Sequence, residues 1–195
     1  MKKSVSKGKL LLILGIVLVV LDQIIKVLVK TNMSVGESID VFSWFKIHFV
    51  LNKGMAFGMA FGGLFGKVLL SLLRIVLFGA LWWWISRLLK KDNTPTGVLV
   101  GLTLIAAGAL GNIFDSFFYG LIWPEVVMEG APFAFMFGQV VDMFYFPLFD
   151  YRLPWQDYTH TFFGAVFNFA DSCVTVGALY LLFFQYKFFA AEEKK

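Results

Sequence analysis

The amino-acid sequence predicts an all-α membrane protein with four transmembrane helices, a small β-containing outer segment and an outer interfacial segment. Hydrophobic residues make up 59% of the 195 positions and charged residues only 15%, whereas soluble domains carry about 25% charged residues. Four apolar stretches reach the roughly 20 residues that a helix needs to cross a bilayer. Lysines and arginines cluster mostly beside these stretches, where they set the orientation of a membrane protein.

The four predicted spans lie at about residues 10–30, 66–89, 97–118 and 164–189. We expect helices there because lipid offers no hydrogen-bond partners and a helix pairs its own backbone groups. The first span follows MKKSVSKGK, which resembles the start of a secretory signal peptide. No small-residue cleavage site follows and the apolar run is long, so we expect this span to stay uncleaved. The chain is therefore interpreted as a single membrane-embedded domain, residues 1–195.

The distribution of basic residues predicts the topology. Those that flank the spans on one side are Lys2, Lys3, Lys7, Lys9, Arg87, Lys90, Lys91, Lys187, Lys194 and Lys195. The long connections 31–65 and 119–163 hold only Lys46, Lys53 and Arg152. By the positive-inside rule both termini and the 90–96 loop are cytoplasmic, and the two long connections face outward.

The two outward connections have different compositions. Residues 37–51, ESIDVFSWFKIHFVL, are rich in aromatic and β-branched residues and alternate in places between apolar and polar, which favours strands. Residues 119–163 are aromatic and hold four of the five prolines. This composition favours an element at the membrane interface over a fifth span.

Composition also excludes several kinds of site. The single cysteine, Cys173, allows no internal disulfide and no multi-cysteine metal site. Two histidines, His48 and His160, are too few for most catalytic zinc sites, though not for every metal. We expect no metal and no other cofactor. The net charge of +4 comes from lysines beside apolar runs and does not predict a nucleic-acid partner.

Polar residues gather near the outward ends of the predicted spans. They are Asp22, Lys26, Asn52, Asn112, Asp115, Asp142, Asn168 and Asp171. A carboxylate at membrane depth costs about 2.5–3.5 kcal/mol on insertion scales, so such an acid indicates function by default. A single acid at a helix start is as readily explained as a cap. The convergence of several acids and asparagines on one face favours a polar site at the lipid boundary.

Two nearby carboxylates predict a mechanism that needs no metal. Because like charges at close range cannot both ionise readily, such a pair shares one proton. One member can then activate water as a base while the other protonates a leaving amine. Cys173 has no neighbouring histidine in the sequence and is interpreted as structural. Asp22 and Lys26 are spaced so that they can pair on one helix face, either to compensate charge or to brace the site.

Five motifs, in order, resemble those of the lipoprotein signal peptidase family, signal peptidase II. DQIIK is similar to D-Q-x-x-K, and NKGMAFG to N-x-G-A-A-F-G. GALGNIFDS resembles G-A-x-G-N-x-x-D-R, VVDM resembles V-V-D-F, and FNFADS resembles F-N-x-A-D-S. The resemblance extends over almost the whole chain and all four spans.

The resemblance implies an aspartyl endopeptidase of the bacterial inner membrane, with its site near the outer face. The family cleaves the signal peptide from prolipoproteins just before a diacylglyceryl-modified cysteine, and the cyclic peptide globomycin inhibits it. Partners are then lipidated prolipoproteins and membrane lipid. The implied catalytic pair is Asp142 and Asp171. The implied binding or supporting residues are Asn112, Asp115, Asn168, Asn52, Gly54, Asp22, Lys26 and Ala170.

The sequence departs from the family pattern at three places. Ser116 stands where the family has an arginine that contacts substrate or inhibitor, and Met55 replaces an alanine. The chain is also longer between Asp142 and Asp171, and we expect the extra stretch within 143–163 to form part of a lid. The acids and the histidine of that stretch are interpreted as solvated; they are Asp150, Asp157 and His160.

Two other functions remain open at the level of sequence. A small ion-coupled transporter could use intramembrane acids as a proton or cation relay, although the acids gather at one face and no inverted repeat is evident. A non-catalytic binder of lipidated proteins is favoured slightly by the missing arginine at Ser116.

Overall fold

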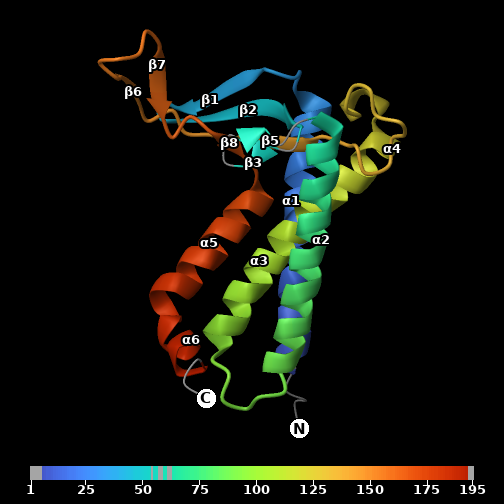
Figure 1. Ribbon diagram of the computed structural model, residues 1–195, viewed down its shortest axis with the longest axis vertical. Helices are drawn as coiled ribbons and strands as arrows, with labels where there is room; N and C mark the ends of the chain where they lie inside the picture. Colours follow the sequence, from blue (N-terminus) through green and yellow to red (C-terminus); the bar gives the residue numbers. More distant parts are fainter. Residues whose placement is uncertain (1–5, 54, 57–58, 61–62, 193–195) are drawn as a thin grey trace. The chain divides into compact units, whose positions relative to one another are not determined.

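The computed structural model describes residues 6–53, 55–56, 59–60 and 63–192. It is mostly helical, with small antiparallel sheets (Figure 1). Its helices are α1 Lys7–Asn32, α2 Gly63–Leu88, α3 Thr96–Phe114, the π-helical turn η1 Asp115–Tyr119, α4 Gly120–Ile122, the 3-10 turn η2 Pro124–Val126, α5 Phe169–Phe184 and α6 Tyr186–Glu192. Its strands are β1 Ser38–Phe42, β2 Phe45–Asn52, β3 Met55–Ala56, β4 Met59–Ala60, β5 Val140–Tyr145, β6 Phe149–Arg152, β7 Thr159–Phe162 and β8 Val166–Phe167.

Three helical stretches within the described residues are long and apolar enough to cross a membrane. They are α1, α2 and the continuous stretch Thr96–Ile122, which comprises α3, η1 and α4. The fourth expected span begins later than predicted, because Val166 and Phe167 form strand β8 and pair with β5. Its helix α5 has 16 residues and is followed after one residue by α6. Three spans therefore meet the length criterion, and the fourth is a shorter apolar helix.

The chain divides into two compact units, each built from several stretches of sequence. The first comprises the described residues of 1–23, 71–114 and 169–195, and the second those of 24–70 and 115–168. The sequence predicted one domain, and no local signal in it marks the boundaries of these units.

The first unit is helical, and small residues let α3 pack closely against α5 (Figure 1). A Cβ on Gly177 would lie 2.8 Å from the carbonyl oxygen of Gly101, and a Cβ on Gly108 would collide with the carbonyl of Ala170. Close approach of this kind is typical of helix contacts in membranes. In the loop before α3, the Thr94 hydroxyl donates to the Leu88 carbonyl at 2.8 Å, which satisfies one of the free carbonyls at the end of α2.

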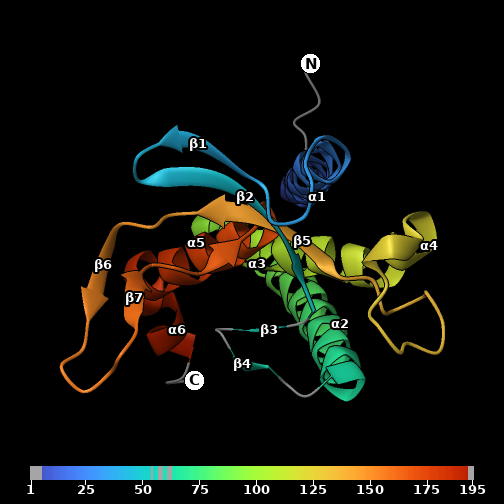
Figure 2. The ribbon, with the colours of Figure 1, turned by 90° about the horizontal axis from the view of Figure 1, so that it is seen from above.

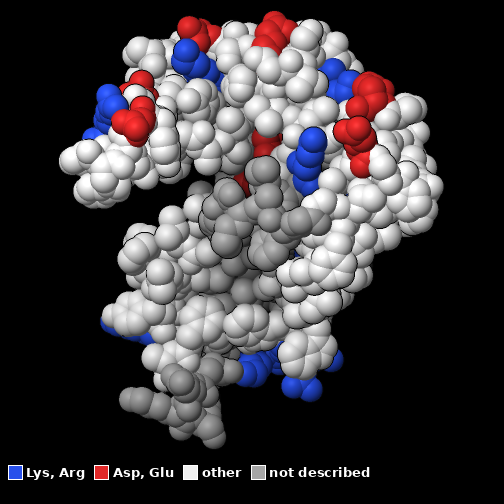
Figure 3. All heavy atoms as spheres, turned by 45° about the horizontal axis from the view of Figure 1, so that its top comes forward, with Lys and Arg blue, Asp and Glu red and all other residues white. Residues whose placement is uncertain are grey.

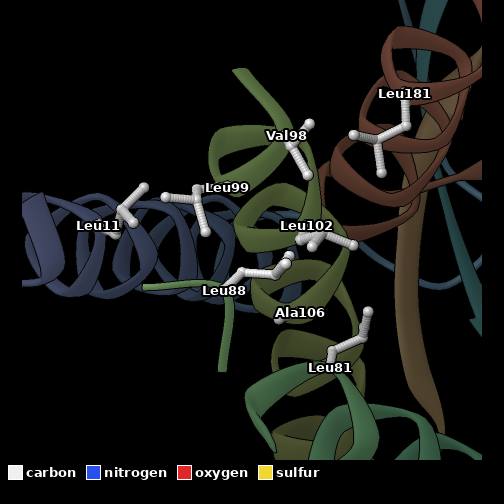
Figure 4. Close-up of a cluster of buried hydrophobic side chains, with 8 residues drawn as sticks. All are labelled: Leu11, Leu81, Leu88, Val98, Leu99, Leu102, Ala106 and Leu181. Atoms are coloured by element: carbon white, nitrogen blue, oxygen red, sulfur yellow. The ribbon is translucent and has the colours of Figure 1, made fainter. Parts of the chain in front are cut away.

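One cluster of aliphatic side chains forms the core of the first unit. Figure 4 shows its eight residues, which come from α1, the end of α2, α3 and α5. They are Leu11, Leu81, Leu88, Val98, Leu99, Leu102, Ala106 and Leu181. Many other apolar side chains of these helices are exposed, as expected for surfaces that face lipid.

The second unit contains, among its described residues, an antiparallel sheet in the order β1-β2-β5-β8 (Figure 2). The strands predicted within 37–51 are confirmed as β1 and β2. The sequence did not predict that the outward connection 119–163 also supplies strands, and β5 is the most buried of the sheet. A second core joins side chains of β2 and β5 to those of α1, η1 and η2. It consists of Val29, Phe49, Tyr119, Val126, Val141 and Met143.

A separate hairpin, β6–β7, occupies the stretch in which the chain is longer than the family pattern. Phe149 pairs with Phe162 and Tyr151 with His160 across the hairpin, and the rings stack at 4.8 Å and 5.3 Å. Acidic and basic side chains are mixed on the surface toward the top of Figure 3. Ion pairs with at least one exposed member include, among the described residues of this unit, Lys30–Glu125, Lys46–Asp40 and Arg152–Asp157. A surface of mixed charge is typical of contact with water.

Candidate active site

Strand β5 of the second unit carries Asp142, whose side chain is 2% exposed. The side-chain amide of Asn52, at the end of β2, donates to Asp142 Oδ2 at 2.9 Å. The amide of Asn168 donates to Asp142 Oδ1 at 2.7 Å. Each carboxyl oxygen thus accepts a hydrogen bond from a different asparagine. Two such contacts from separate segments fix the plane and direction of this carboxyl group.

Asp115 braces the same strand from the π-helical turn. Its carboxylate lies 2.8 Å from the Lys26 ammonium, and neither side chain has any exposed surface. The backbone N–H of Val141 donates to Asp115 Oδ2 at 3.4 Å. Because Val141 directly precedes Asp142, the contact holds β5 next to the candidate catalytic acid. These contacts support a positioning role for Asp115.

Lys67 and Ser116 form a further buried polar contact in the second unit. Lys67 lies near the start of α2, and its ammonium donates to the Ser116 hydroxyl at 3.1 Å. Both side chains are almost completely buried. From the sequence, Ser116 was identified only as a position where the family pattern has an arginine. Lys67 was not predicted as a site residue. The available signal was a lone lysine in the apolar stretch LFGKVLL.

In the first unit, Asp171 lies in the first turn of α5. The Asn112 side-chain amide, near the end of α3, donates to Asp171 Oδ1 at 2.8 Å. An acid in the first turn of a helix is also favoured by the helix dipole. Asp171 thus has the position of a helix-start acid together with a specific amide partner from another helix. Asp142, on strand β5, likewise accepts hydrogen bonds from side-chain amides.

Asp22 caps the start of α5 from the distant helix α1. Its Oδ1 accepts the backbone N–H of Ala170 at 2.9 Å, which satisfies one of the free donors at a helix start. The Gln23 side-chain amide donates to Asp22 Oδ2 at 3.0 Å and to the Gly111 carbonyl at 3.3 Å. A Cβ on Gly111 would lie 2.6 Å from Asp22 Oδ2. Sequence reasoning missed Gln23 and Gly111, although both lie within the quoted motifs.

The predicted site residues therefore form two sets, one in each unit. The set in the second unit is Asn52, Asp142, Asn168, Lys26 and Asp115. The set in the first unit is Asn112, Asp171, Asp22 and Ala170. Gly54 lies outside the described residues. The pairing of Asp142 with Asp171, and that of Asp22 with Lys26, stay predictions.

Four other titratable side chains that the sequence analysis considered lie outside these two sets of site residues. On the hairpin, Asp150 accepts a hydrogen bond from Thr161 and Asp157 is fully exposed. His160 contacts the Gln156 side chain. Cys173 is buried, in agreement with a structural role. Among the described residues, no group of three or more His, Cys, Asp or Glu side chains is placed to hold a metal ion.

Apolar helices of spanning length, small antiparallel sheets and buried, amide-held carboxylates together define an integral membrane protein with an acidic polar site. The family model for signal peptidase (SPase) II matches residues 14–187. The chain therefore belongs to the signal peptidase II family, as its motifs implied.

Named relatives and solved structures agree with this membership. The chain is 43% identical over 189 residues to the lipoprotein signal peptidase of Porphyromonas gingivalis strain ATCC 33277, with 90% of this chain and 82% of the relative covered. It is 37% identical over 171 residues to that of Amoebophilus asiaticus, with 84% and 72% covered. A solved bacterial membrane enzyme, at 22% identity, shares the fold with a TM-score of 0.67 over 95% of this chain and 92% of that one.

Proposed function

We propose that this chain is an aspartyl endopeptidase that removes the signal peptide from diacylglyceryl-modified prolipoproteins just before the lipidated cysteine. Asp142 and Asp171 are the catalytic pair. The observation that carries the proposal is the hydrogen bond from Asn168 to Asp142 at 2.7 Å. Asn168 precedes Asp171 by three residues, so the backbone limits their Cα separation to about 10 Å. The chain itself thus tethers Asp171 to the residue that orients Asp142.

In this mechanism the two carboxyl groups share one proton, because two like charges at close range do not both ionise readily. The ionised carboxylate takes a proton from water, and the water oxygen bonds to the scissile carbonyl carbon. The protonated carboxyl group gives its proton to the carbonyl oxygen. When the C–N bond breaks, the leaving nitrogen receives a proton from the pair. As the C=O bond re-forms, a hydroxyl of the tetrahedral intermediate returns its proton to the pair. The pair thus receives two protons, one from water and one from this hydroxyl, and gives up two, so it returns to its starting state.

The supporting residues hold this pair in place. Asn52 and Asn168 orient Asp142, and Asn112 orients Asp171. Asp115 positions Asp142 by accepting the backbone N–H of the preceding residue, Val141. Asp22 positions Asp171 by accepting the backbone N–H of the preceding residue, Ala170. Gly54 is assigned a supporting role by the family resemblance alone. Positioning of this kind matters because catalysis depends strongly on the placement of the reacting groups.

We further propose four spans, with both termini cytoplasmic and the site near the outer face of the bacterial inner membrane. The helices α5 and α6 together, Phe169–Phe184 and Tyr186–Glu192, are long enough to serve as the fourth span. The bias of lysines and arginines supports the orientation. Membrane lipid and globomycin-type inhibitors are the further partners that the family resemblance implies.

Family membership favours the peptidase over the two other functions. The relatives reported above are named lipoprotein signal peptidases. The missing arginine at Ser116 was the feature that favoured a binder. The buried lysine beside it weakens that argument, because a cation is present next to position 116.

The test follows release of the signal peptide from a synthetic diacylglyceryl prolipopeptide by the purified chain in detergent. We expect Asp142→Asn and Asp171→Asn to abolish cleavage, Asp115→Asn to retain part of it, and Asp40→Asn to leave it unchanged. Asp40 is the matched control because it is exposed on β1. Loss with Asp115→Asn and retention with Asp142→Asn would move the catalytic pair to Asp115 and Asp171. Tight lipopeptide binding without cleavage by the unaltered chain would instead identify a binder.

A further inference from the structure

Lys67 is a buried cation on a helix of membrane-spanning length. Its side chain is 1% exposed, and α2 is otherwise apolar around it, in the stretch LFGKVLL. Burying an ammonium group is unfavourable unless hydrogen bonds and opposite charges compensate it. Groups around Lys67 must therefore compensate its positive charge.

The contact of Lys67 with Ser116 lies beside the acids of the second unit. The ammonium donates to the Ser116 hydroxyl at 3.1 Å, and Ser116 directly follows Asp115 in the π-helical turn. Asp115 in turn accepts the N–H of Val141, next to Asp142. A lysine from α2 thus reaches the position at which the family pattern has an arginine. Serine, which is small and carries a hydroxyl, leaves room for the ammonium and accepts its hydrogen bond.

The buried charges of the second unit are balanced only if Lys67 is counted. Among its described residues, the charged side chains that are almost completely buried are Lys26, Lys67, Asp115 and Asp142. These are two cations and two acids, and Lys26 is ion-paired with Asp115. Without Lys67 the set would carry one more acid than base. An excess negative charge in a buried region is unfavourable.

We infer that Lys67 supplies, from α2, the positive charge that the family pattern places at position 116, and so balances the buried acids that include Asp142. The inference rests on the proposed function and deepens it. Lys67 is a positioning residue, because it donates a hydrogen bond to Ser116 and acts through that residue. The lysine–serine pair and an arginine at 116 are then two alternative ways to place one cation, and exchanging them together restores function.

The experiment measures kcat and KM for the diacylglyceryl prolipopeptide with a double-mutant cycle. We expect Lys67→Met to lower kcat/KM by about a hundredfold, mainly through kcat, because it removes one partner of a buried charged set. Lys67→Arg keeps the charge and retains more activity than Lys67→Met. Ser116→Arg alone brings two cations together and lowers activity. The combined Lys67→Met and Ser116→Arg variant regains at least about tenfold over Lys67→Met, since coupled sites are not additive.

Two controls separate charge from other roles. Ser116→Ala removes the hydroxyl but leaves the ammonium, so we expect a loss about tenfold smaller than that of Lys67→Met. Lys30→Met, on α1, removes a partly buried cation whose partner Glu125 is exposed and leaves kcat/KM unchanged. Equal losses with Ser116→Ala and Lys67→Met would reduce the role of Lys67 to a hydrogen bond and overturn the inference. So would a combined variant no better than the product of its two single changes.

Failure of the proposed peptidase function can be distinguished from failure of the inference about Lys67. If the unaltered chain does not cleave the lipopeptide, the peptidase proposal fails, and the charge exchange is then judged from thermal unfolding in detergent. A midpoint that Lys67→Met lowers and the combined variant restores supports the inference. A combined variant with the lowest midpoint of the set contradicts it.

Discussion

The ammonium of Lys26 lies 2.8 Å from the carboxylate of Asp115, and both side chains are completely buried. Lys26 comes from α1 and Asp115 from the turn that follows α3, so the contact joins distant parts of the sequence within the second unit. Removing one partner of a buried ion pair leaves the other charge uncompensated, which costs about 3–5 kcal/mol. We therefore expect Lys26→Met to lower the free energy of unfolding by about this amount, measured by thermal unfolding in detergent.

The same helix provides a matched control for that prediction. Lys30 lies 2.7 Å from Glu125, but their side chains are 14% and 60% exposed, and exposed pairs contribute little. The hydrogen bond from Lys30 lowers the pKa of Glu125. Any stability from this pair is thus present above the carboxyl pKa of the unfolded chain and is lost as the pH falls through the lowered pKa of the folded state. Equal destabilisation by Lys26→Met and Lys30→Met at neutral pH would contradict the prediction.

The asparagines that hold the two candidate catalytic acids provide a second prediction. Loss of a hydrogen bond to a charged group costs about 1.5–3 kcal/mol, which corresponds to about ten- to hundredfold in rate. We expect Asn168→Ala and Asn112→Ala each to lower kcat in this range with a smaller change in KM, measured with the diacylglyceryl prolipopeptide. Asn32→Ala is the control, because Asn32 is exposed and donates only to its own helix region. Unchanged kcat in both site variants would argue against a role for the amides.

Gly111 provides a test of close packing at Asp22. An alanine Cβ there would lie 2.6 Å from Asp22 Oδ2 and 3.2 Å from Ala170 Cβ, and overpacking of this kind costs about 1–3 kcal/mol. Gly79 on α2 has nothing within 4 Å of such a Cβ, so alanine there gains helix propensity, about 1 kcal/mol. We expect the unfolding midpoint to fall for Gly111→Ala and to rise for Gly79→Ala. A shift of the same sign in both would refute the packing argument.

The acids of the β6–β7 hairpin are expected not to take part in catalysis. Asp157 is exposed, and Asp150 accepts a hydrogen bond from the Thr161 hydroxyl at 2.7 Å. Substitutions at such surface positions usually change free energies by less than about 0.5 kcal/mol, or about twofold. We expect Asp150→Asn and Asp157→Asn to cleave the lipopeptide within about twofold of the unaltered chain. A loss of cleavage activity as large as that expected for Asp171→Asn would indicate that the hairpin takes part in catalysis.

Local signals in the sequence predicted the helical membrane class, the strands β1 and β2, and the residues of the candidate site. The helices follow from apolar length, which is a property of each stretch alone. The strands follow from aromatic and β-branched residues in partial alternation. The fourth helix begins at Phe169 and not at about 164, because the preceding residues pair with β5. No local pattern contains that partner, so the boundary was misplaced.

Acids and lysines that lie in apolar runs can be identified from the amino-acid sequence alone, because each is recognised from its immediate neighbours. Which of them meet depends on how the chain folds. Asn52 reaches Asp142 across 90 residues, Asp22 caps α5 across 148, and Lys67 meets Ser116 across 49. These partners are set by strand register and helix packing, which depend on contacts between segments far apart in the chain. A motif can therefore identify a site residue, but its hydrogen-bond partner emerges only when those segments pack together.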